Sequence, residues 1–351
     1  MLILPDLKKL QLKGSQVKAT RGISIEKKQK MKIIIIATTT LLIFGNASAQ
    51  KEVVVAKDGS GKYETVQQAL NAVPLHNKMP ITIFIKDGIY KEKLKLDSSK
   101  HFVTIVGENK FKTILTYDDH TGKVTRNGDT INTRTSASFL VSANDFTAKD
   151  ITIQNDAGFT AGQAVALESD GDKAQFYNCR LVGFQDVLFT NNKNSRQYYK
   201  DCYIEGTTDF IFGSATVWFE HCHIHSKKNS HVTAASTPDD HQYGYVFNDC
   251  ILTGDTSLHS VSLGRPWRPY ASVTYMHCFM DEHIKPEGWS NWNQTENYKT
   301  ARYSEYKNYG PGASVATRVP WSKQLTDAEE ENITIKNILD GWEPKDCNFK
   351  M

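Results

Sequence analysis

The chain has 351 residues, of which 39% are hydrophobic and 23% charged; these are globular values and exclude a disordered, collagen-like or coiled-coil protein. Residues 1–49 hold nine of the 42 Lys and Arg residues but only two of the 39 Asp and Glu residues, so the formal net charge of +3 becomes −4 from residue 50 onward. This balance excludes a basic nucleic-acid-binding surface, and we expect no nucleic-acid partner.

The first predicted element is a leader. Met31 and Lys32 precede an apolar run that ends near Phe44, and an Ala-Ser-Ala sequence ends at Ala49. This is the pattern of a secretory signal peptide cleaved after Ala49, and the run is too short for the roughly 20 residues of a membrane span. We predict that residues 1–30 are an upstream extension or result from a start codon assigned too early. Residues 31–49 are predicted to be a signal peptide and residues 50–351 a mature domain. The product is expected to be secreted or periplasmic, without a membrane anchor.

A helix and then a repeat follow in the mature domain. Residues 63–70 are amphipathic and are expected to form a helix that closes the N-terminal end. Farther along, one local pattern recurs at steps of 20–28 residues, with Asp, Asn or His before an apolar position and a strand-like segment after it. The apolar positions are Ile151, Cys179, Cys202, Cys222, Cys250 and Cys278. An aromatic residue stands two or three positions before each cysteine.

Irregular repeats of this length, built from short alternating strands, predict a solenoid. No repeat contains a helix-length periodic stretch, so we predict an all-β parallel β-helix in which the cysteines stack in the interior. An antiparallel β-sandwich is the alternative, because its strands also recur at short intervals. Residues 327–338 are expected to form a second helix that lies across the outside.

Two carboxylates fall at matched places in this repeat. Asp186 follows Cys179 by seven residues, and Asp209 follows Cys202 by seven residues. If the coils stack in register, the two backbones lie one strand spacing apart, about 4.8 Å. Two carboxyls this close among aromatic residues cannot both ionise freely, which favours an acid/base pair with divided roles. The alternative is a pair of turn-forming aspartates without chemistry.

An ordered set of motifs resembles the pectin methylesterase family (carbohydrate esterase family 8). The resemblance covers roughly residues 52–345, and its motifs lie at 55–61, 65–67, 88–92, 163–167, 183–186, 209–213, 263–267 and 309–313. It implies a single-stranded right-handed parallel β-helix of the pectin lyase-like type. It also implies a bacterial-type secreted enzyme that hydrolyses the methyl esters of pectin (homogalacturonan) and releases methanol.

The resemblance also implies a role for each matching residue. Asp209 would be the nucleophile that attacks the ester carbonyl, and Asp186 the acid that protonates methanol and the base that then activates water. Gln185 and Gln163 would stabilise the oxyanion. Arg265 would hold Asp209 ionised and contact the substrate. No cofactor and no metal are implied, and we expect a monomer.

Further substrate contacts and one disulfide are implied in the same way. Thr133 matches a substrate-contacting threonine, and Trp267 offers an apolar face to a sugar ring. Cys202 and Cys222 match positions that are paired in some members, and stacked coils place Cα atoms within the disulfide range of about 4.4–6.8 Å. A reduced ladder of interior cysteines is the equally weighted alternative.

Several other clusters are interpreted as structural. His221, His223 and His225 alternate along one segment and are expected to form a solvated outer face rather than a metal site. The clusters at 118–120 and 239–241 are interpreted as loops. For Trp289 and Trp292, a sugar-binding cleft and loop packing are left as equal alternatives.

Two competing functions are carried forward. One is cleavage of the polysaccharide chain on the same scaffold, by a hydrolase or a calcium-dependent lyase, since close carboxylates also suit a retaining glycosidase. The other is a non-catalytic β-helix adhesin. The oxyanion-type residues Gln163 and Gln185 argue against the first, and the aspartate pair in phase with Arg265 argues against the second.

Overall fold

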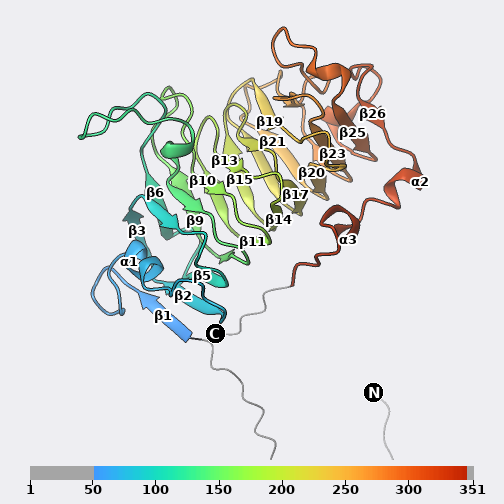
Figure 1. Cartoon of the computed structure of the whole chain (residues 1–351). Coiled ribbons are helices and arrows are strands. Elements are labelled where there is room, and N and C mark those ends of the chain that lie inside the picture. Colours follow the sequence, from blue (N-terminus) through green and yellow to red (C-terminus); the bar gives the residue numbers. More distant parts are fainter. Residues whose placement is uncertain (1–50, 346–351) are drawn as a thin grey trace, which may run out of the picture. The chain divides into compact units, whose positions relative to one another are not determined.

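Three parallel β-sheets enclose one interior in the computed structural model, which describes residues 51–345 (Figure 1). The strands of each sheet are not consecutive in sequence: β11, β14 and β17 are neighbours in one sheet, β12, β15 and β18 in the second, and β10, β13 and β16 in the third. Each turn of the chain therefore adds one strand to every sheet. This confirms the parallel β-helix and rules out the antiparallel sandwich.

Sheet A has eleven strands: β1 Lys51–Val55, β2 Ile81–Ile85, β5 Val103–Gly107, β8 Thr147–Lys149, β11 Ala174–Tyr177, β14 Arg196–Lys200, β17 Thr216–Glu220, β20 Tyr245–Asn248, β23 Ser272–Met276, β25 Arg302–Tyr306 and β26 Lys323–Gln324. Sheet B has eight: β3 Gly88–Lys91, β6 Thr113–Tyr117, β9 Thr152–Asn155, β12 Arg180–Val182, β15 Tyr203–Gly206, β18 His223–Ser226, β21 Ile251–Gly254 and β24 Phe279–Met280. Sheet C has seven: β4 Leu94–Leu96, β7 Phe139–Val141, β10 Leu167–Ser169, β13 Leu188–Thr190, β16 Ile211–Gly213, β19 His231–Ala235 and β22 Ser262–Gly264.

The corner between sheets A and B explains the Asp, Asn and His of the repeat. The residue before each apolar position has a left-handed backbone, with φ between 48° and 56°. Asn, Asp and His tolerate this conformation better than other residues with a side chain. The corner residues are Asp150, Asn178, Asp201, His221, Asp249 and His277. The sequence repeat is thus a repeat of one turn geometry.

The predicted interior rows are present. The apolar positions Ile151, Cys179, Cys202, Cys222, Cys250 and Cys278 are all buried. Beside them, aromatic rings stack from coil to coil with centroids 4.4–5.1 Å apart, in the order Phe176, Tyr199, Phe219, Phe247 and Tyr275. In the first of these coils Phe176 is the interior ring, and its neighbour Tyr177 packs in a separate cluster with Tyr198 and Trp218.

The five described cysteines are free thiols. Of the two alternatives for Cys202 and Cys222, the structure has the reduced ladder and not the bridge. Both thiols are buried, and each lies 3.4 Å from backbone carbonyl oxygens, Cys202 Sγ from that of Phe176 and Cys222 Sγ from that of Tyr199. The interior row is thus filled by small apolar side chains that satisfy their weak donors locally.

The predicted N-terminal helix is α1 (Val66–Asn71), which packs against β1 and β4 with Val66, Ala69 and Leu70 buried. The Oγ1 atom of Thr65 accepts a hydrogen bond from Gln68 N. The carboxylate of Glu92 also accepts hydrogen bonds from the first backbone N–H groups of the helix, at 3.0 Å each. An acidic residue at a helix N-terminus satisfies unpaired donors and the helix dipole, which gives the motif at 88–92 a structural role.

The tail differs from the prediction of one helix. Two short helices, α2 (Asp327–Glu330) and α3 (Ile335–Ile338), are separated by a turn, and Thr326 and Thr334 begin them as N-caps. The tail does lie on the outside: Ile333, Ile338 and Leu339 pack on the cluster on the outer face of sheet A that includes Trp218. The 3₁₀ helices are η1 Arg134–Ser136, η2 Asn297–Lys299 and η3 Pro311–Ala313.

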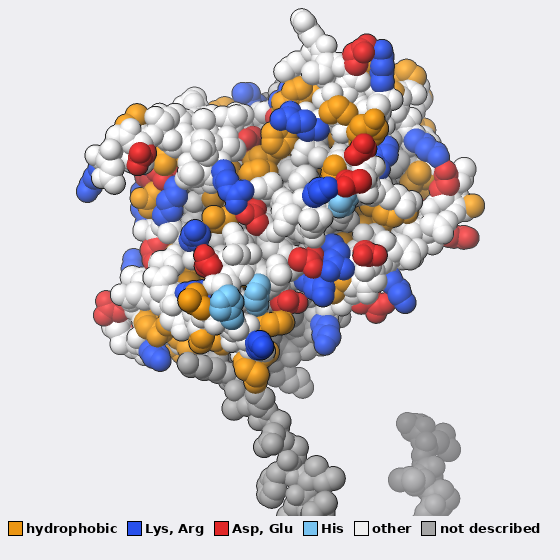
Figure 2. Space-filling view, viewed as in Figure 1, with side chains coloured by type: hydrophobic (Ala, Val, Ile, Leu, Met, Phe, Trp, Pro, Cys, Tyr) orange, Lys and Arg blue, Asp and Glu red, His pale blue; other side chains and the backbone are white. Residues whose placement is uncertain are grey.

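Charges of both signs are mixed over the face of the molecule shown in Figure 2. Among residues 51–345, no helix has the length and apolar character needed to cross a membrane. The predicted signal peptide and upstream segment lie outside the described residues, and so does Cys347.

Candidate active site

Asp186 and Asp209 lie in the turns that lead from sheet B into sheet C. Strands β13 and β16 pair Leu188 with Ile211, and each aspartate precedes its strand residue by two positions. Backbone hydrogen bonds extend the pairing through the turn, from Asp186 N to Thr208 O at 3.1 Å. The two aspartates are therefore in register on adjacent coils, one strand spacing apart (about 4.8 Å between backbones). This is the arrangement that their common seven-residue offset predicts.

Both turns hold the aspartate in a left-handed conformation, with φ of 65° for Asp186 and 49° for Asp209. Asp adopts this region more readily than most residues, so the turn and the chemistry favour the same residue type. The two interpretations, turn former and acid/base group, are therefore not exclusive. Both side chains are nearly buried, with 7% and 5% of the residue surface exposed.

Arg265 binds one aspartate of the pair. Its Nε and Nη2 atoms donate to the two carboxylate oxygens of Asp209, at 3.0 and 2.6 Å. The flat face of the guanidinium packs on the Trp292 ring, with Cζ 4.0 Å from the ring centroid. Arg265 follows β22, where Gly264 has no space for a side chain: a Cβ atom there would lie 2.0 Å from Thr233 Oγ1. The arginine is thus fixed by a close-packed strand end.

The two carboxyls differ in their electrostatics because Arg265 contacts only Asp209. Burial raises the pKa of Asp186 well above its usual range, and the charge of Asp209 raises it further. Burial also raises the pKa of Asp209, but the hydrogen bonds and charge of Arg265 oppose this effect. Arg265 thus favours the ionised form of Asp209, and burial beside it favours the protonated form of Asp186. A pair with this asymmetry can supply one acid and one nucleophile.

The two glutamines form the neighbouring row. Gln163 and Gln185 pair as a parallel bridge, and Ala164 N donates to Gln185 O at 3.0 Å. Both side chains line the same cavity of about 430 Å³ as the aspartates. Their side-chain amides can donate hydrogen bonds, which is the chemistry that stabilises an oxyanion.

All seven candidate residues line this one cavity: Thr133, Gln163, Gln185, Asp186, Asp209, Arg265 and Trp267. Reasoning from the sequence left Trp292 undecided between a sugar-binding cleft and loop packing. It missed five other lining residues, Asn132, Arg134, Phe189, Phe212 and Ala234. Phe189 and Phe212 stack with centroids 4.3 Å apart and form an aromatic floor. Strand alternation could have found them, because each follows an inward residue of sheet C by one position.

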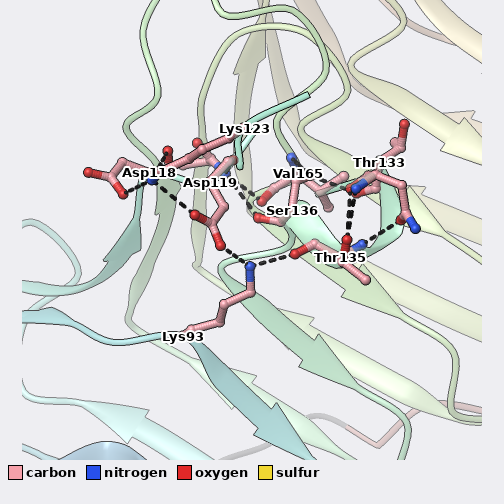
Figure 3. A network of polar contacts seen from close by, with 10 residues as sticks. Lys93, Asp118, Asp119, Lys123, Thr133, Thr135, Ser136 and Val165 are labelled. Carbon is pink, nitrogen blue, oxygen red and sulfur yellow. Dashed lines mark hydrogen bonds and ion pairs between the residues drawn. The ribbon is translucent and has the colours of Figure 1, made fainter. Parts of the chain in front are cut away.

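The segment that carries Thr133 is held by a polar network (Figure 3). Lys93 bonds Asp119 and the carbonyl of Thr135, and Lys123 contacts both Asp118 and Asp119 at 3.0 Å. In addition, Ser136 Oγ donates to Thr133 O and accepts from Val165 N. The acidic pair at 118–119 is therefore structural, as expected, and it fixes the loop that borders the cavity.

The two tryptophans and the cluster at 239–241 have different roles in the structure. Trp289 is buried and donates to Glu305, so it packs the core, whereas Trp292 belongs to the cavity. Asp240 pairs with Lys193 and His241 in a loop, as interpreted.

The prediction that three histidines share one outer face is only partly confirmed. His223 and His225 lie on β18 and both hydrogen-bond Thr253, whereas His221 occupies the left-handed corner and does not share their face. Among the described residues, the group with metal-binding spacing joins His221 to Glu220 and Asp249, and not to the other two histidines.

His231 is a neighbour that sequence reasoning missed. Its backbone carbonyl accepts a hydrogen bond from Asp209 N at 2.8 Å, and its Nδ1 lies 2.6 Å from Ser262 Oγ. Burial, with the nearby charges of Arg265 and Lys285, lowers its pKa to about 3. The imidazole is therefore neutral and leaves the charge of the site to the arginine and the aspartates.

Comparison with known proteins agrees with this geometry. Residues 52–342 match the family model described as Pectinesterase. The chain belongs to the pectinesterase family. It is 40% identical over 291 residues to Pectinesterase 31 of Arabidopsis thaliana. The aligned region covers 82% of this chain and 91% of the relative.

Solved structures show the same likeness. The pectin methylesterase from carrot has a TM-score of 0.77 at 34% identity, over 84% of this chain and 94% of that one. A pectin methylesterase in complex with a hexasaccharide has a TM-score of 0.74 at 28% identity, over 84% and 98%. Pectinesterase 31 and Putative pectinesterase 11 of Arabidopsis thaliana are plant proteins, and similar solved structures include a bacterial enzyme from Erwinia chrysanthemi, so these relatives do not single out the bacterial members of the family. The reaction is the hydrolysis of the methyl esters of homogalacturonan, and the chain-cleaving and adhesin alternatives have no support.

Proposed function

We propose that this esterase works through Asp209 as nucleophile and Asp186 as general acid and base. The observation that carries the proposal is the difference between the two carboxyls: Arg265 forms two hydrogen bonds with Asp209, while Asp186 is buried beside the resulting anion. One group is thereby prepared to attack and the other to give up a proton.

In the first half-reaction, a carboxylate oxygen of Asp209 forms a bond to the ester carbonyl carbon of a galacturonate unit. The carbonyl oxygen becomes an oxyanion, to which Gln185 and Gln163 would donate hydrogen bonds. The bond from carbon to the methoxy oxygen then breaks, and the proton of Asp186 passes to that oxygen. Methanol leaves, and an acyl-enzyme anhydride on Asp209 and an ionised Asp186 remain.

In the second half-reaction, Asp186 takes a proton from water, and the resulting hydroxide attacks the galacturonate acyl carbon. The bond to Asp209 breaks, which releases a galacturonic acid unit that then loses its proton to solvent, and both aspartates return to their starting protonation states. Phe189, Phe212, Trp267 and Trp292 offer the apolar faces on which sugar rings can stack, and Thr133 borders the same cavity.

Methyl-esterified pectin is the substrate of this proposal, and the exported location is part of it. The signal-peptide pattern at 31–49 supports export. The bacterial type and the monomeric state are further parts of the proposal. N-terminal sequencing of the exported protein should find Gln50 as the first residue, and any start before Met31 in the exported product would contradict this part.

The experiment that tests the function uses purified mature protein and highly methylated pectin. We expect methanol release with no loss of chain length, measured by alcohol assay and by size-exclusion chromatography. New reducing ends would indicate a hydrolase, and unsaturated ends would indicate a lyase. Asp209→Asn is the matched control, and methanol release at the wild-type rate by this variant would overturn the assignment of the nucleophile.

A further inference from the structure

A second cavity lies beside sheet B, on a different face of the solenoid from the candidate active site over sheet C. Its volume is about 420 Å³. Among residues 51–345, no side chain lines both cavities, and the proposed mechanism gives the residues of this one no role. The residues that line it include Lys110, Phe111, Arg180, Asp201, Tyr203 and His223.

The floor of this cavity belongs to an outward row of sheet B. The strand register places Arg180 opposite Tyr203 and Tyr203 opposite His223, and the row continues through Ile251 to Phe279. The next residue of each strand is buried, so alternation directs the row to the outside. With one strand spacing of about 4.8 Å per coil, the row is about 19 Å long, which is room for several sugar units.

Arg180 is a cation that is held mainly by aromatic rings. Its Cζ atom lies 5.3 Å from the centroid of the Phe111 ring and 5.5 Å from that of the Tyr203 ring, and both are cation–π distances. Within residues 51–345 the guanidinium donates one hydrogen bond, from Nη1 to Thr152 Oγ1 at 3.3 Å, and forms no ion pair with a carboxylate. Since arginine has five N–H donors in the plane of the group, most of them are free for a ligand.

The loop that carries Lys110 and Phe111 is fixed in place. Thr152 Oγ1 donates to Lys110 O, and Lys110 Nζ donates to Asn178 Oδ1. The backbone N–H of Phe111 donates to Asn109 Oδ1 at 2.9 Å. The Phe111 side chain is nevertheless 61% exposed. An apolar ring that is held over a guanidinium and outside the core is a surface that a ligand can cover.

The charge of the cavity favours an anion. Arg180 and Lys110 supply two cations, and Asp201 is the one carboxylate among the residues that line the cavity. Burial and the neighbouring His225 lower the pKa of His223, so that imidazole adds no charge at neutral pH. Aromatic rings for the apolar faces of sugars, next to an arginine without a carboxylate partner, suit a polymer of uronic acids. The reaction of this family produces such carboxylates along its own substrate.

We propose that this surface, the sheet B groove formed by Lys110, Phe111, Arg180, Tyr203 and His223, is a second, non-catalytic binding site for a de-esterified segment of galacturonan. Arg180 binds a carboxylate of the polymer through its in-plane N–H groups, and Phe111 and Tyr203 contact the adjacent sugar rings. Because the groove and the active site lie on different faces, the groove attaches the enzyme to the polymer and does not select the ester that is hydrolysed. The inference is independent of which aspartate attacks.

The first test locates the bound polymer by hydrogen exchange and mass spectrometry, with and without polygalacturonate, which has no ester to hydrolyse. The polymer should slow exchange in the peptide that contains residues 109–112. Arg180→Gln should abolish this protection and leave any protection of residues 183–189, next to the active site, unchanged. Arg126→Gln, which removes an exposed arginine that lines neither cavity, should behave as the wild type. Wild-type protein without protection at 109–112, or equal protection in Arg180→Gln, overturns the proposal.

The second test measures the ratio of kcat/KM for partly de-esterified pectin to that for a fully methylated trimer, which is too short to reach both cavities. Arg180→Gln should lower this ratio about three- to tenfold, through KM for the polymer, as expected when one of two linked contacts is lost. An equal loss on both substrates would place the effect in the catalytic cavity and overturn the proposal, and so would an unchanged ratio.

Phe111→Ala keeps the proposal falsifiable if Arg180→Gln fails to fold, because it changes an exposed side chain. It should weaken the protection at 109–112 and lower the ratio in the same direction, and wild-type values in both tests would overturn the proposal. Light scattering identifies the competing occupant: a wild-type dimer that becomes a monomer in Phe111→Ala would assign the groove to a second copy of the chain instead.

Discussion

Asp186 and Asp209 occupy the same place on successive coils, yet Arg265 hydrogen-bonds Asp209, while no ion pair is formed by Asp186 within residues 51–345. Equivalent backbones therefore carry carboxyls of different character. The asymmetry comes from a side chain two coils away, because β22 is separated from β16 by β19 alone. The first two predictions test this asymmetry.

The Asp186→Asn and Asp209→Asn variants should differ in their reaction with an activated ester, whose leaving group needs no proton. Asp186→Asn should still form the acyl-enzyme and release one burst of product, then stall because water is not activated. Asp209→Asn should give no burst. Rapid-mixing absorbance measurements on both variants, after circular dichroism has verified their fold, decide the assignment. A burst from Asp209→Asn with none from Asp186→Asn would reverse it.

Removal of the guanidinium should shift the pH profile. Arg265 lowers the pKa of Asp209 against the effect of burial, so Arg265→Gln should raise that pKa. Asp209 attacks only when ionised, and the acid limb of kcat/KM should therefore move to higher pH. At neutral pH we expect kcat/KM to fall by about 10–100-fold. The pH–rate profile is measured beside that of Arg126→Gln; an unshifted acid limb would contradict the role of Arg265.

Glu168 should make the stability of the fold depend on pH. Its pKa is about 8 in the folded protein against an ordinary value of 4.5, so the folded state keeps a proton that the unfolded state loses. Stability is then fully present below about pH 4.5 and decreases as the pH rises toward about 8. Glu168→Gln removes this loss, and its Tm should exceed that of the wild type by about 2–4 °C at the upper end. Thermal unfolding at several pH values measures the difference, and a difference that shrinks with rising pH would refute the prediction.

The interior cysteines should be reduced and inaccessible. Because Cys202 and Cys222 are buried free thiols, neither should react with a thiol reagent in the native protein. Both should be labelled after denaturation without reductant, as peptide mass spectrometry can show. A peptide pair that is linked only in the absence of reductant would restore the disulfide alternative.

Much of the fold could be read from local repetition. The cysteine and isoleucine row, the Asp, Asn and His of each corner and the seven-residue offset of the aspartates all repeat with the coil, because each coil must make the same turn and fill the same interior row. Parallel stacking then places equivalent residues side by side. Period and register alone were therefore sufficient to predict the carboxyl pair.

Tertiary structure decided what local repetition does not encode. Arg265 reaches an aspartate 56 residues away, Arg134 covers a glutamate 34 residues away, and of two tryptophans three positions apart only Trp292 faces the cavity. These contacts depend on how irregular loops fold over the face of sheet C, and such loops share no period with the coils. The sequence by itself determined the scaffold and the place of the carboxyl pair, whereas the fold of the loops decided which carboxyl pairs with an arginine and which side chains line the cavity.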